Sequence, residues 1–178
     1  MEFEKLKTEI LAGKIFIYPT DTIYGLGCDA TNTESVEKIK KLKERDREKP
    51  LSIIAPSITW IKKNLIIEEG LDIKKYLPGP YTLLLKKKDI NFMNHVSSNT
   101  KLGVRIPNNK FCRDIMKIGI PFITTSVNLS GEPFALKISD INPEILKSVD
   151  YIIEAEKESE LSGKPSTLII DGKEMERR

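Results

Sequence analysis

The sequence of 178 residues has only two cysteines, one histidine and no long apolar run. Cys28 and Cys112 are far apart and lie in no metal-ligand spacing, so we expect two buried thiols rather than a metal site or a disulfide framework. No apolar stretch approaches the roughly 18 residues that a membrane-spanning helix needs. Residues 1–10 lack the basic and apolar regions of a secretory signal. These absences favour a cytoplasmic protein with no membrane contact.

The sequence also lacks the usual catalytic signatures. It has no serine–histidine–acid set, no cysteine–histidine pair in a known context, no metal cluster and no Walker-type loop. The single histidine, His95, is interpreted as a surface or turn residue. Catalysis would therefore depend on positioning and on cationic stabilisation, which are the means used in nucleotidyl and phosphoryl transfer.

The composition is that of a globular protein, with 39% hydrophobic and 31% charged residues. The length suffices for one good core and is short for two, so we expect a single domain over residues 1–178. The net charge of +3 permits contact with nucleic acid but does not argue for it.

Hydrophobic patterns alternate between helical and extended segments along the chain. Expected helices are 2–12, 33–43, 57–64, 70–76, 109–117 and 142–148, and expected strands are 15–18, 51–54, 81–85, 103–107, 121–125, 151–154 and 167–170. This alternation, with no internal repeat, predicts an α/β fold built on one sheet.

Residues 18–27, YPTDTIYGLG, follow a short apolar strand and combine hydroxyls, an aromatic ring and two glycines. We interpret them as the lip of a pocket rather than a core element, because ligands bind beyond strand ends in open α/β sheets. Gly25 and Gly27 would let backbone amides approach an anion. The alternative is a polar loop whose threonines satisfy only local backbone groups.

Residues 43–50, KERDREKP, place cations where a helix ends and a strand begins. Such cations complement the helix dipole, so a solvated charged corner is one interpretation. The other is that Lys43 and Arg45, two positions apart, point together toward a phosphate or carboxylate.

Two further clusters carry polar groups on strands. In TTSVNLSG, residues 124–131, Ser126 and Asn128 share one face of extended chain and would be offered together, although local capping of the next turn explains either residue alone. In GVRIP, residues 103–107, Arg105 faces opposite to its apolar neighbours, into solvent or into a cleft lined by anions.

Six motifs in order, YPTDTIYGLG, K-x-R with KPL, PGPYTLLL, GVRIPN, TTSVNLSG and Pro165-Ser166-Thr167, resemble the YrdC/TsaC type of threonylcarbamoyl-AMP synthase over nearly the whole chain. The chain is similar to the short, single-domain form. The resemblance implies a twisted open mixed α/β sheet flanked by helices around a large basic cavity. It implies that L-threonine, bicarbonate and ATP, accompanied by Mg²⁺, give threonylcarbamoyl-AMP and pyrophosphate. A separate threonylcarbamoyl transferase would use this product in the t6A modification of tRNA.

The resemblance also implies site residues. It assigns catalysis and ATP binding to Lys43, Arg45, Ser126 and Asn128, with Lys49 as a further ATP-binding candidate. It assigns the threonine pocket to Thr20, Tyr24, Ser52, Arg105, Thr124 and Ser166, with Arg105 as the partner of the threonine carboxylate. It implies no protein-held metal.

The chain departs from the family pattern in two places. Asp46 stands where relatives commonly have proline, beside the expected phosphate site, and Arg177 or Arg178 would have to replace an arginine that helps to cover the nucleotide. One alternative function is a module that binds double-stranded RNA or tRNA without chemistry. Another is transfer of a related carbamoyl adenylate to a different acceptor.

Overall fold

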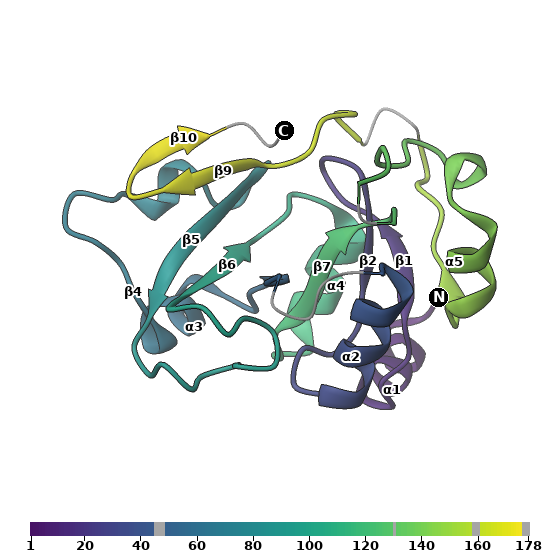
Figure 1. Ribbon diagram of the computed structural model, residues 1–178, viewed down its shortest axis with the longest axis horizontal. Helices are drawn as coiled ribbons and strands as arrows, with labels where there is room; N and C mark the ends of the chain where they lie inside the picture. Colours follow the sequence, from purple (N-terminus) through teal and green to yellow (C-terminus); the bar gives the residue numbers. More distant parts are fainter. Residues whose placement is uncertain (45–48, 130, 158–160, 176–178) are drawn as a thin grey trace.

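The computed structural model describes residues 1–44, 49–129, 131–157 and 161–175 (Figure 1). Within these residues ten strands form one mixed sheet in the order β10-β9-β5-β6-β3-β7-β2-β1-β8, with β4 paired to β5. The strands are β1 Phe16–Pro19, β2 Tyr24–Gly27, β3 Ser52–Ile54, β4 Leu65–Ile66, β5 Tyr81–Lys87, β6 Lys101–Arg105, β7 Phe122–Ser126, β8 Tyr151–Ile152, β9 Thr167–Ile170 and β10 Lys173–Met175. The expected α/β fold with a twisted open sheet is confirmed.

Parallel and antiparallel pairs alternate irregularly across the sheet. β1 with β8, β3 with β6 and β5 with β9 are parallel, and the remaining pairs are antiparallel. The first strand of the chain and the last two lie toward opposite edges of the sheet (Figure 1).

Helices flank the sheet, and four of the five in the described part of the chain begin at a residue whose side chain caps them. They are α1 Phe3–Leu11, α2 Thr33–Leu42, α3 Ile58–Asn64, α4 Lys110–Lys117 and α5 Pro143–Ser148, with short 3₁₀ turns η1 Ile73–Lys75 and η2 Ile138–Asp140. The side chains of Asn32, Ser57, Asn109 and Asn142 accept backbone hydrogen bonds at the starts of α2, α3, α4 and α5.

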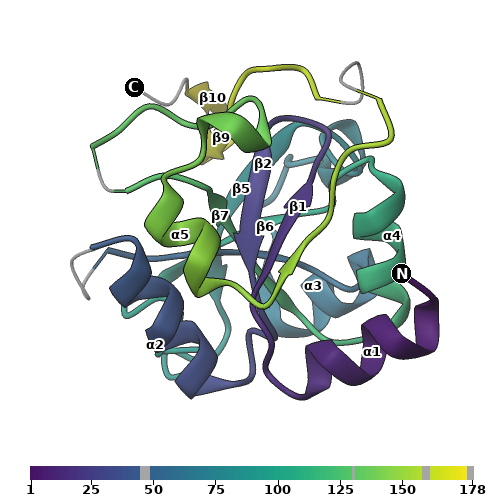
Figure 2. The same cartoon turned by 90° about the vertical axis from the view of Figure 1, so that its right-hand side faces the viewer.

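The core lies on both faces of the sheet because residues along a strand alternate in direction. Phe16 and Tyr18 of β1 pack in a cluster that includes residues of α1 and α4, whereas Ile15 and Ile17 belong to the larger cluster that includes Val36 of α2. Figure 2 shows α1 and α4 on one side of β1, with α2 and α5 on the other.

Two expectations about local structure are wrong. The segment 70–76 forms only the 3₁₀ turn η1 rather than a helix, because Pro78 follows closely and disfavours helical backbone in the residue before it. Residues 24–27 form the buried strand β2 between β1 and β7, so this half of the expected lip belongs to the core, although Tyr24 and Gly25 also line the cavity described below.

Candidate functional site

A cavity of about 550 Å³ lies over the sheet, and its floor is made of small residues on neighbouring strands. Ser52 of β3 is directly opposite Thr124 of β7, and Gly25 of β2 is opposite Ser126 of β7. Thr124 and Ser126 are two positions apart in β7, so they share the face that Ser52 also presents. Hydroxyls and a glycine at these positions leave room for a ligand and offer hydrogen bonds to it.

All six residues expected in the threonine pocket line this cavity. They are Thr20, Tyr24, Ser52, Arg105, Thr124 and Ser166, and Ser126 and Asn128 line it as well. The residues that the resemblance assigned therefore lie together in one cavity, and their roles there stay predictions. The basic character expected of it stays a prediction, since the described lining contains one cationic side chain, Arg105, and one carboxylate, Glu132.

The turn between β1 and β2 is held by its own hydroxyls. The Thr20 hydroxyl donates to the carbonyl of Ile23 (2.7 Å), accepts from the amide of Thr22 (3.0 Å) and lies 2.8 Å from the Thr22 hydroxyl. Thr20 is only 1% exposed. Its hydroxyl thus fixes the shape of the cavity wall, and direct binding of a ligand by Thr20 stays a prediction.

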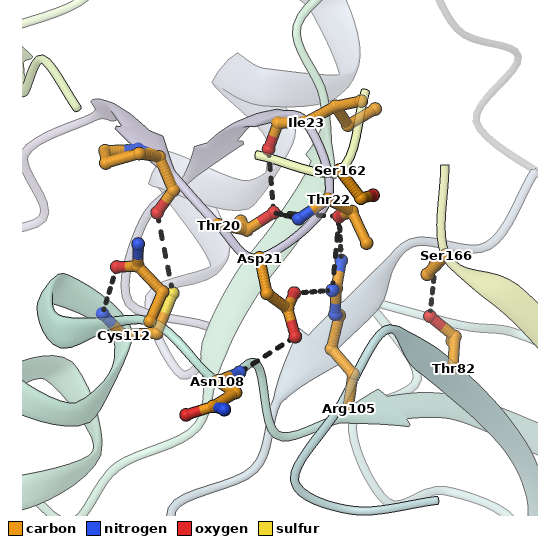
Figure 3. A network of polar contacts seen from close by, with 12 residues as sticks. Thr20, Asp21, Thr22, Ile23, Thr82, Arg105, Asn108, Cys112, Ser162 and Ser166 are labelled. Carbon is orange, nitrogen blue, oxygen red and sulfur yellow. Dashed lines mark hydrogen bonds and ion pairs between the residues drawn. The ribbon is translucent and has the colours of Figure 1, made fainter. Parts of the chain in front are cut away.

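Arg105 reaches the cavity wall from the end of β6 and forms an ion pair there (Figure 3). Its Nη2 donates to Asp21 Oδ1 (2.6 Å), and Nη1 and Nη2 each lie 3.3 Å from the Thr22 hydroxyl. The other carboxylate oxygen of Asp21 accepts from the amide of Asn108 (2.8 Å). The sequence left solvent and cleft open for Arg105, and the structure places it in the cleft, with Asp21 as the anion.

Lys43, Ser126 and Asn128 come together, as the sequence predicted. The ammonium of Lys43 donates to the carbonyls of Ser126 and Asn128 and to Asn128 Oδ1 (3.2 Å), and the Ser126 hydroxyl donates to that same Oδ1. The fourth member, Arg45, lies outside the described residues, as does Asp46.

The burial of Lys43 corrects an expectation. One interpretation of residues 43–50 was a solvated charged corner, yet Lys43 is only 2% exposed and is not one of the described residues that line the cavity. It follows α2 as its C-cap, where backbone carbonyls favour a cation. Lys49 is exposed and is likewise absent from the described lining, so its role in ATP binding stays a prediction.

The two glycines of the lip differ in what they do. Gly25 lines the cavity, and a Cβ there would lie only 3.0 Å from the ring of Tyr18, so the glycine accommodates that ring. Gly27 does not line it, and a Cβ there would lie 2.0 Å from the carbonyl oxygen of Ile123. Close packing of β2 on β7 is therefore the reason for Gly27, rather than the approach of an anion.

Sequence reasoning missed several lining or supporting residues, chiefly Asp21, Thr22 and Thr82. Thr82 is fully buried in β5 and its hydroxyl lies 2.8 Å from that of Ser166. A lone threonine in the apolar run 81–85 was a usable signal, because a buried hydroxyl requires a partner. The pairing of Asp21 with Arg105 had no local signal, since 84 positions separate them.

The remaining candidate groups lie away from this chemistry. Cys28 and Cys112 are free and buried, as expected, and burial raises the pKa of both thiols. His95 lies in a turn, half-buried, with Nε2 2.7 Å from the carbonyl oxygen of Ala30. Among the described residues, no three histidine, cysteine or acidic side chains are grouped to hold a metal ion, and no helix is long and apolar enough to cross a membrane.

Fold and cavity together define an α/β protein with a polar ligand site on the face of an open mixed sheet. The Sua5/YciO/YrdC family model, which carries the description "telomere recombination", matches residues 8–177. The chain therefore belongs to the Sua5/YciO/YrdC family.

Individual relatives agree with this assignment. The chain is 39% identical over 168 residues to a putative threonylcarbamoyl-AMP synthase of Methanocaldococcus jannaschii, covering 93% of this chain and 78% of that one. It is 29% identical over 150 residues to the threonylcarbamoyl-AMP synthase of Vibrio campbellii, covering 80% of each. The structure of a doubly substituted P. abyssi Sua5 superposes with a TM-score of 0.82 at 25% identity, over 94% of this chain. The chain spans about half, 49%, of that Sua5 chain.

Proposed function

We propose that the protein is a threonylcarbamoyl-AMP synthase that joins L-threonine, bicarbonate and ATP and releases pyrophosphate. The observation that carries the proposal is the gathering, in one cavity, of eight residues selected from the sequence motifs of this family. The names of the curated relatives support the same activity.

The reaction requires little covalent chemistry from the protein. The threonine amine and bicarbonate give a carbamate and water, a carbamate oxygen attacks the α-phosphorus of ATP, and the bond to pyrophosphate breaks. Mg²⁺ enters with ATP as part of the substrate, because Mg²⁺ is commonly held by phosphates and water with few protein ligands. The protein contributes binding, orientation and charge.

The geometry suggests a division of the cavity. Arg105 would bind the threonine carboxylate, since its guanidinium lies in the wall and has N–H groups that are not directed at Asp21 or Thr22. Ser126 and Asn128 would contact the nucleotide, and Lys43, whose ammonium bonds their carbonyls, would hold them in place and add positive charge. Arg45 is proposed as the second cation at the phosphates.

The product is an activated acyl adenylate, so a second enzyme must consume it. We propose a threonylcarbamoyl transferase that acts on tRNA in t6A formation. A reactive product of this kind is protected when water is excluded from the site where it forms.

The first test is product formation measured by mass spectrometry. The protein is incubated with MgATP and bicarbonate plus L-threonine, L-serine or no amino acid, and a threonine-dependent adenylate is expected. Arg105→Gln should lower the yield, whereas the matched change Arg113→Gln, at an exposed position on α4, should not. If ATP is not consumed and the folded protein instead retains duplex RNA in a salt-sensitive way, the proposal is wrong.

A further inference from the structure

Asp21 lies in the turn between β1 and β2 and joins parts of the chain that are distant in sequence (Figure 3). One carboxylate oxygen accepts from Nη2 of Arg105 and the other accepts from the amide of Asn108. The two side chains of the ion pair are 11% and 7% exposed. Water thus has little access to the pair, and neither charge would be stable there alone.

The contacts fix one edge of the Arg105 guanidinium. Both terminal nitrogens face the turn, where Asp21 and the Thr22 hydroxyl accept from them. Three of the five guanidinium N–H donors are used in this way, and of the other two Nε is buried and has no hydrogen-bond partner among the described residues. The orientation of the arginine in the cavity wall is therefore determined by Asp21 and Thr22.

The turn itself does not depend on the Asp21 carboxylate. The backbone carbonyl of Asp21 accepts from the amide of Ser162 (3.3 Å), and that of Thr22 accepts from the amide of Gly163 (3.0 Å). The hydroxyl of Thr20 adds a further bond within the turn. A change confined to the carboxylate should leave the backbone in place and act on Arg105.

We propose that Asp21 is a positioning residue for Arg105 and that it sets the affinity for the carboxylate of the amino-acid substrate, an inference that rests on the proposed function. Preorientation of a binding group lowers the entropy that a ligand must overcome, so it acts mainly on substrate affinity. The predicted loss of affinity concerns threonine and not ATP, because the Asp21 carboxylate bonds Arg105 and none of the residues proposed to bind ATP.

The test is the isosteric variant Asp21→Asn. The carboxylate of Asp21 has two acceptor oxygens, one for Nη2 of Arg105 and one for the amide of Asn108. The amide of asparagine has only one, so one of these two donors would face an NH₂ group. We expect the KM for L-threonine to rise roughly 10- to 100-fold, the size of losing a hydrogen bond to a charged group. The kcat and the KM for ATP should change little, and calorimetry should show the same loss in L-threonine binding without turnover.

Asp29→Asn is the matched control. Asp29 is also a buried aspartate after a strand, with its carboxylate accepting from the amide and hydroxyl of Thr31, but it does not line the cavity. The Asp29→Asn variant should have a lower melting temperature than the wild type and the same KM for threonine.

Three outcomes would overturn the inference. If the wild-type protein is active and Asp21→Asn has an unchanged KM for threonine, the positioning role of Asp21 is refuted while the proposed function stands. The same holds if both aspartate variants lose affinity for threonine and for ATP to an equal extent. A wild-type protein that neither forms product nor binds threonine refutes the proposed function as well. If Asp21→Asn does not fold, Thr22→Val removes the other acceptor of the guanidinium, and an unchanged threonine KM there counts against the proposal.

Discussion

Replacement of Lys43 by methionine should destabilise the protein as well as impair its activity. Methionine fills most of the volume of the lysine side chain but has no ammonium group. In the native protein this group donates to the carbonyls of Ser126 and Asn128, and Lys43 is only 2% exposed. The variant therefore removes a charged donor from two half-buried carbonyls, of which that of Ser126 also accepts from the amide of Asn128.

The magnitude follows from the two lost hydrogen bonds between the ammonium and the carbonyls. A hydrogen bond to a charged group contributes about 1.5–3 kcal/mol, so two such bonds imply about 3–6 kcal/mol. Burial of the apolar methionine offsets part of this cost, and we expect a net loss of about 3 kcal/mol. For a chain of this size that corresponds to a fall in melting temperature of roughly 6–12 °C. The variant should still fold, since domains commonly have about 5–15 kcal/mol of stability.

The assay is urea unfolding followed by circular dichroism, with melting temperature as a second measure. Lys38→Met, at an exposed lysine on α2 paired with Glu34, is the control and should change stability by less than about 0.5 kcal/mol. An unchanged unfolding midpoint in Lys43→Met would refute the reasoning, because it would mean that the buried ammonium does not support the segment 126–128.

Two further changes test the packing. Gly27→Ala should prevent folding, because its Cβ would lie 2.0 Å from the carbonyl of Ile123, whereas Gly172→Ala, with open space but φ +75°, should fold with a loss of about 1–2 kcal/mol. Soluble yield and circular dichroism measure both, and a wild-type melting temperature for Gly27→Ala would contradict the model of strand packing. Burial raises the pKa of the thiols of Cys28 and Cys112, so the folded protein keeps their protons to higher pH than the unfolded chain. Their contribution to stability is complete below about pH 8.5 and falls as unfolded thiols ionise above it. Unfolding free energies measured from pH 7 to 10 should therefore decrease less in a Cys28→Ala/Cys112→Ala variant than in the wild type.

Much of the fold was predictable because local patterns and tertiary structure agree. The helix at 33–42 has an apolar face and an asparagine cap, and the strand at 167–170 is a short run rich in β-branched residues. Strand β2 was not predictable in this way. Two glycines and a preceding proline are typical of a turn, and it is the pairing of the segment with both β1 and β7 that makes it a strand.

The site divides similarly. Ser126 and Asn128 lie together as expected, but the reason differs from the one the sequence offered: β7 ends at Ser126, and a bend brings the amide of Asn128 onto the Ser126 carbonyl. The burial of Lys43 and the ion pair between Asp21 and Arg105 depend on contacts across 83 or more positions. The sequence indicates that a buried lysine or arginine needs a carboxylate or carbonyl partner. It does not indicate which carboxylate or carbonyl the fold brings close to it.

The wall of the cavity is closed by residues 162–166, which bond the turn after β1 and continue into β9. During synthesis the strands that form the floor leave the ribosome long before this segment exists. A nascent chain, or one cut before residue 162, would have the floor without the wall that Pro165 and Ser166 provide. Substrates bind and stabilise only the form that has the whole site. Bound substrate therefore stabilises full-length molecules and not fragments. In a cell rich in substrate, it would protect the full-length protein from degradation.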